Sequence, residues 1–125
     1  MNRHRDRDIA DLLSRVCELG SLAERALRDA IWASLHHDVA LAHSVMDGDD
    51  AVDDLAGEIN ETSFRLIARY QPVASDLRAL EAAIRMALDL ERISDLAGNI
   101  AKITVHSDEP LSPPDTVRLA GERVV

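Results

Sequence analysis

Two pairs of carboxylates have the spacing that places them side by side on helices. Asp49 and Asp53 are four residues apart, and so are Glu91 and Asp95. Residues at this spacing are neighbours on one helix face, where like charges repel one another and burial makes ionisation costly. Three arrangements would relieve the repulsion: solvent exposure, ion pairs with nearby arginines, or a bound cation, because hard cations take several oxygen ligands. The spacing by itself leaves these alternatives open.

Long helices must carry both pairs. Ala, Leu, Asp and Arg dominate the sequence, and apolar residues recur at three- and four-residue steps, which is typical of helices. The pattern predicts helices over about 9–35, 39–70 and 75–105. A helix of 18 residues makes five full turns, so Asp95 shares the angle of Leu77, and Asp49 that of Ile67. Acids therefore lie on helix stripes that are otherwise apolar.

The expected fold class is all-α. Three long helices with short connections indicate an antiparallel three-helix bundle over 8–105, in which Ser75 is the expected N-cap of the third helix. A proline-containing linker follows over 106–114. Residues 115–125 read as the beginning of a fourth, truncated helix. A chain of 125 residues fits one domain.

The charge distribution excludes several functions. The formal net charge is −9, and the window from Asp29 to Phe64 holds nine acids and no Lys or Arg. An acidic chain without a basic stripe is a poor nucleic-acid ligand, so we expect no nucleic acid as a partner. No apolar run approaches the length of a membrane span, and the N-terminus lacks the apolar segment of a secretory signal. Cys17, the single cysteine, reads as a small core residue and suits a reducing cytoplasm.

Four runs of residues resemble the PhoU family of phosphate-uptake regulators. The most specific are RYQPVASDLR (69–78) and DLERISDLAGNI (89–100); VMDGDDAVD (45–53) and LGSLAE (19–24) resemble its second and first helices. The similarity covers roughly residues 8–104. The resemblance implies two tandem three-helix repeats, of which this chain holds one and the start of the next. Either the chain is a fragment, or two chains pair as a homodimer to replace the missing half.

The resemblance also implies a metal centre. PhoU proteins bind multinuclear iron or zinc clusters through acidic motifs with this four-residue spacing; magnesium and manganese are alternatives here. Matched by position, the metal ligands are Asp49, Asp53, Glu91, Asp95 and Asn99. The chain departs from the family where an acid often follows three residues after Asp53, since Ala56 stands there.

The function that the resemblance implies is regulation rather than catalysis. It implies a cytoplasmic negative regulator that couples the phosphate ABC transporter, through its ATPase, to a sensor histidine kinase, and that represses the phosphate-starvation response when phosphate is plentiful. Such a protein meets the membrane only through its partners. Two alternatives remain: a helical dimerisation or interaction fragment without a signalling role, and a carboxylate-metal enzyme. The enzyme is the weaker one, because no histidine accompanies the acids and no nucleophile–base pair is recognisable.

Overall fold

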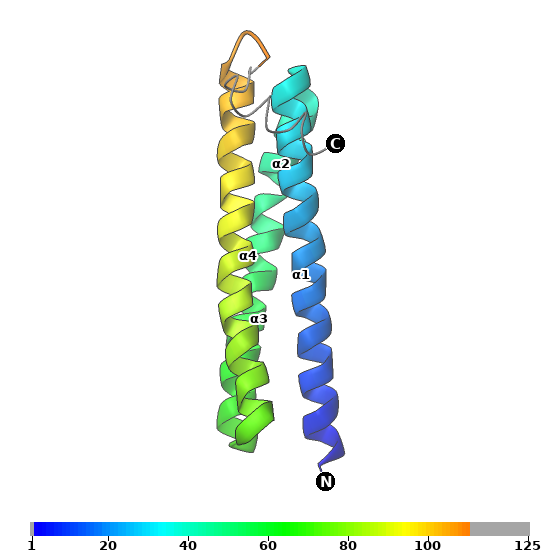
Figure 1. Cartoon of the computed structure of the whole chain (residues 1–125), viewed down its shortest axis with the longest axis vertical. Coiled ribbons are helices and arrows are strands. Elements are labelled where there is room, and N and C mark those ends of the chain that lie inside the picture. The colour runs from blue at the N-terminus through cyan, green and yellow to red at the C-terminus, as the bar shows by residue number, and fades with distance from the viewer. Residues whose placement is uncertain (1, 111–125) are drawn as a thin grey trace, which may run out of the picture.

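The computed structural model describes residues 2–110 and consists of helices arranged as three rods. The rods are α1 (Arg3–His36), α2 with α3 (Val39–Asp47 and Asp49–Tyr70), and α4 (Ala74–His106). α1 and α4 stand side by side and run in the same direction, while α2 and α3 return behind them in the opposite direction (Figure 1). The prediction of an all-α bundle is confirmed. Among residues 2–110, no helix is both long and apolar enough to cross a membrane.

The second rod is not continuous, and the prediction of one helix over 39–70 is wrong at this point. α2 ends at Asp47 and α3 begins at Asp49, with Gly48 between them at φ −79° and ψ −8°. Glycine is a poor helix former, so a break here costs little. The break makes Asp49 and Asp50 the first turn of α3, where carboxylates are favoured by the helix dipole.

Each of the two tight connections begins with a residue in the left-handed conformation. His37 follows α1 at φ 52°, and Gln71 follows α3 at φ 45°. The predicted N-cap at Ser75 is wrong, because α4 already begins at Ala74 and Val73, in extended conformation, occupies the cap position without a side-chain hydrogen bond. The chain reverses so tightly after Gln71 that the helix starts one residue before the expected serine.

The core runs along the inner faces of the three rods in two clusters. One is built from large residues, including Leu12, Leu19, Ile59 and Leu80, of which Leu12 is 1% exposed and the other three are fully buried. The other lies at the end that holds α2 and consists mainly of alanines. Small side chains let helices approach closely there.

Two further predictions from the sequence differ from the structure, and a third concerns residues that the structure does not describe. Cys17 is exposed, so its interpretation as a core residue is wrong. The first helix starts at Arg3, six residues earlier than predicted, and the last ends at His106. Residues 115–125, the predicted start of a further helix, and residues 111–114 of the predicted linker lie outside the described residues.

Candidate metal centre

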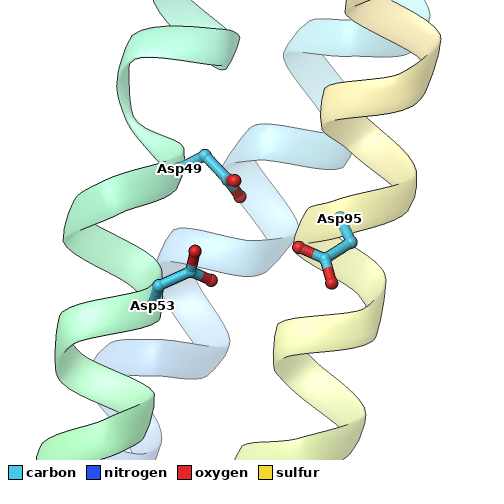
Figure 2. Close-up of side chains that lie close together, drawn as sticks. All are labelled: Asp49, Asp53 and Asp95. Carbon is cyan, nitrogen blue, oxygen red and sulfur yellow. The ribbon is translucent and has the colours of Figure 1, made fainter.

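The structure brings acids from two antiparallel rods together. Asp49 and Asp53 extend from α3 toward α4, and Asp95 extends from α4 toward them, with α1 behind (Figure 2). One carboxylate oxygen from each of the three residues lies within 4.8 Å of the other two. We call these residues the acidic triad. Asp49 and Asp95 are 46 residues apart in the sequence, so the triad exists only because α3 packs against α4.

A serine on the core side of α4 supports the triad. Ser94 is 3% exposed, and its hydroxyl donates a 3.4 Å hydrogen bond to Oδ1 of Asp49. A buried hydroxyl needs such a partner. Ser94 lies directly before Asp95 in the sequence, and the spacing of residues by itself does not identify its hydrogen-bond partner. The only signal for its role was a small polar residue directly before Asp95 in an otherwise apolar stripe.

The acids strain one another electrostatically. The pKa of Asp49 is raised above its ordinary value, first by partial burial and then by the negative charges of Asp53 and Asp95. The pKa of Glu91 is also raised, first by partial burial, then by the charge of Asp53 and a hydrogen bond with it. Both shifts mean that the ionised cluster is unfavourable by itself.

Arginines do not compensate this charge. Arg92, one turn from the triad, pairs instead with Asp89 at 3.7 Å. Within residues 2–110, no basic nitrogen forms an ion pair with Asp49, Asp53, Glu91 or Asp95. Of the three arrangements that the spacing leaves open, ion pairing with a basic residue is therefore not found for these four acids within the described part of the chain. Solvation and a bound cation remain.

The other predicted ligands lie at the edges of the triad. Glu91 is one turn before Asp95 on α4 and contacts Asp53. Asn99, one turn after Asp95, lines a surface hollow together with Asp49, Asp95 and Lys102. Ala56, where the family often has an acid, lies in the buried core at 3% exposure. The structure thus places Asp49, Asp53 and Asp95 in one close group, with Glu91 in contact with Asp53 and with Asn99 in the hollow that Asp49 and Asp95 also line.

The donor set fits a hard cation. All donors of the triad are carboxylate oxygens, the ligand type that suits magnesium, calcium and manganese. Metal–oxygen distances of about 2.0–2.6 Å place opposite ligands at most about 5 Å apart, and the spread of the triad oxygens lies within that range. Asp49, Asp53 and Asp95 would hold the ion, with Glu91 and Asn99 beside it. The ion would supply the positive charge that the cluster lacks.

Comparison with known proteins now adds the family. Residues 16–104 match the PhoU domain. The chain belongs to the PhoU family. This match includes both helices that carry the acidic triad and the turn between them.

Full-length relatives are similar to this PhoU domain over less than half of their own length. A PhoU homolog of Rhizobium meliloti, named a phosphate-specific transport system accessory protein, is 42% identical over 97 residues, which is 78% of this chain and 41% of the relative. The PhoU protein of Serratia marcescens is 37% identical over 108 residues, 83% of this chain and 44% of the relative. PhoU homolog 1 of Thermotoga maritima is 37% identical over 99 residues, 79% of this chain and 43% of the relative.

Proposed function

We propose that this PhoU-family chain is an accessory regulator of phosphate uptake. It acts on the cytoplasmic side as an adaptor between a phosphate ABC transporter and a sensor histidine kinase, and lowers phosphate-starvation signalling when phosphate is plentiful. The observation that supports this most is the match of residues 16–104 to the PhoU domain, together with relatives named accessory proteins of the phosphate-specific transport system.

The acidic triad gives this regulator a cation-dependent surface. Without a cation, Asp49, Asp53 and Asp95 present a negative patch between α3 and α4 that no ion pair compensates within the described residues. A bound ion neutralises the patch and ties α3 to α4, which changes both the charge and the rigidity that a partner meets. We propose no catalysis at this site, since an adaptor needs a stable surface rather than a reacting group.

The test of the adaptor role is binding to the two partners. The purified chain is passed over the immobilised ATPase of the transporter and over the cytoplasmic part of the kinase, in buffer with manganese and in buffer with chelator. Retention by both partners is expected, and it should be weaker with chelator. Binding to neither partner in either buffer would refute the proposal.

A matched pair of variants distinguishes the loss of a triad carboxylate from a general change in the net charge of the chain. Asp53→Asn removes a triad carboxylate, whereas Asp54→Asn removes the next acid along α3, which is exposed and outside the triad. The first variant should lose the manganese-dependent part of partner binding, and the second should keep it. Measured phosphoester hydrolysis by the manganese-loaded chain would favour the enzyme alternative instead.

A further inference from the structure

A cavity lies between α1 and the second rod, at the level of the break between α2 and α3. Its volume is about 330 Å³, at the lower end of the range of about 300–1,000 Å³ that is typical of small-molecule pockets. Gly48, which forms the break, and Ser94 of α4 both line it. The hollow beside the acidic triad is lined by α2, α3 and α4 and shares no lining residue with this cavity. We call the new space the break cavity.

The break cavity lies where the two core clusters meet. Leu22 and Val52 belong to or pack against the cluster of large residues, and Ala26 and Val45 belong to or pack against the alanine-rich cluster. Val45 and Val52 are buried whereas Gly48 is exposed, so the cavity has an apolar interior and opens to solvent. A well-packed core leaves few voids larger than a water molecule. A space of this size can therefore admit an apolar group of a ligand.

Two charged residues of α1 stand beside these apolar walls. Arg25 and Asp29 both line the cavity and are one helical turn apart. At this spacing an acid that precedes a base pairs better than the reverse order. Glu24 and Arg28 have the favourable order and form an ion pair. Arg25 and Asp29 have the reverse order, and neither forms an ion pair with any residue of 2–110. The cavity therefore offers a ligand both a cation and an anion.

These features are complementary to a small zwitterion with an apolar side chain. A ligand carboxylate can accept two hydrogen bonds from the guanidinium of Arg25. A ligand ammonium can donate to the carboxylate of Asp29, while an apolar side chain fills the space that Val45 and Val52 line. We propose that the break cavity binds a free α-amino acid with an apolar side chain about the size of leucine. This proposal does not rest on the adaptor role, and each can fail without the other.

Inorganic phosphate is a poorer match for the same cavity. Its charge would meet one arginine but also the carboxylate of Asp29, and the window from Asp29 to Phe64 adds further acids without any Lys or Arg. Phosphate would also leave the apolar walls in contact with water, whereas an aliphatic side chain displaces that water. The balance of charge and apolar surface therefore favours the amino acid.

Amide spectra of the nitrogen-labelled full chain test the site directly. Leucine, valine and methionine are titrated separately, in chelator and in buffer without phosphate. The amide resonance of Gly48 should shift in a saturable way, because Gly48 lines the cavity. Gly57 of α3, which does not line the cavity, should keep its position. If none of the three amino acids gives a saturable shift of Gly48, the proposal is overturned.

Two analogues of leucine test the recognition of both charges. Isocaproate keeps the side chain and the carboxylate but lacks the ammonium, and isoamylamine keeps the side chain and the ammonium but lacks the carboxylate. Each should bind at least about ten-fold more weakly than leucine, because each loses a charge-assisted hydrogen bond. Phosphate should leave the Gly48 resonance in place. An analogue that binds as tightly as leucine, or phosphate that displaces leucine, would refute the zwitterion as the ligand.

Variants then assign the two charges. Asp29→Asn should weaken leucine binding at least about ten-fold and leave isocaproate binding unchanged, and Arg25→Gln should weaken leucine binding as much but leave isoamylamine binding unchanged. Arg28→Gln and Glu24→Gln are the matched controls, because both residues are exposed on the same helix outside the cavity. Circular dichroism confirms that each variant is helical; if one cavity variant does not fold, the other carries the test. Undiminished leucine binding by either folded cavity variant would overturn the proposal.

Discussion

The hydroxyl of Tyr70 donates a 2.7 Å hydrogen bond to Oδ2 of Asp8, which lies 62 residues earlier in the chain. This contact joins the end of α3 to the start of α1. Beside it, Arg5 of α1 forms a 3.4 Å ion pair with Asp76 in the first turn of α4. The run RYQPVASDLR, which carries much of the family resemblance, thus holds all three rods together at one end of the bundle.

Loss of the Tyr70 hydroxyl should destabilise the chain. Tyr70→Phe keeps the ring and removes the donor, so we expect the free energy of unfolding to fall by about 1 kcal/mol. Urea denaturation measures it. Asp8→Ala should cost a similar amount, and the double variant should cost no more than either single variant, because both remove the same bond. Fully additive losses would show that the two residues act independently.

The left-handed residue after α3 offers a stabilising change. Gln71 has φ 45°, a conformation that costs a non-glycine residue about 1 kcal/mol. Gln71→Gly should therefore raise the free energy of unfolding by several tenths of a kcal/mol, measured as an increase in the urea midpoint.

His37 provides the comparison, because it is equally left-handed at φ 52° but its Nε2 lies 2.6 Å from the carbonyl oxygen of Ser107. His37→Gly removes the cost of the left-handed conformation but also loses that hydrogen bond. Its net gain in the free energy of unfolding should therefore be smaller than that of Gln71→Gly. A larger gain from His37→Gly would contradict the importance of the contact with Ser107.

Cation binding should depend on the acidic triad. Replacing Asp95 by Asn removes one charged ligand, and we expect manganese affinity to fall at least about ten-fold, since even residues behind the ligands have effects of that size. Isothermal titration calorimetry measures the affinity. Asp89→Asn is the control, because Asp89 lies on the same helix outside the triad and pairs with Arg92. Equal affinities in wild type and Asp95→Asn would exclude this site.

The raised pKa of Glu91 predicts a pH effect on stability in the absence of cations. Between its ordinary pKa of 4.5 and its raised value, the folded chain binds more protons than the unfolded chain. The contribution of Glu91 to the free energy of unfolding therefore falls as the pH rises through that interval. Glu91→Gln should be more stable than wild type at pH 7, by about 0.2–0.5 kcal/mol for each like-charge contact removed.

That difference should shrink as the pH is lowered toward 4.5, which urea denaturation in chelator at several pH values can follow. Glu81→Gln, on an exposed position of α4 outside the triad, serves as the control and should show no such convergence. Parallel pH profiles for wild type and Glu91→Gln would contradict the electrostatic explanation.

The sequence determined the helices and the pairs of acids on them. Both depend on local periodicity: three- and four-residue steps specify an amphipathic helix, and a separation of four places Asp49 beside Asp53 on any helix. The positions of the helix ends were predicted less accurately. The start of α4 depends on the backbone geometry of a tight turn, and the end of α2 on a one-residue break at Gly48, and hydrophobic periodicity reports neither.

Only the tertiary structure decided which residues meet. Asp95 reaches Asp49 because the short turn between α3 and α4 brings these two residues to the same level of two antiparallel helices. Cys17 was misplaced for a related reason. α1 and α4 each carry two adjacent apolar seams, and one residue separates them. Periodicity detects both, but only packing against α3 selects which seam is buried and leaves the other exposed.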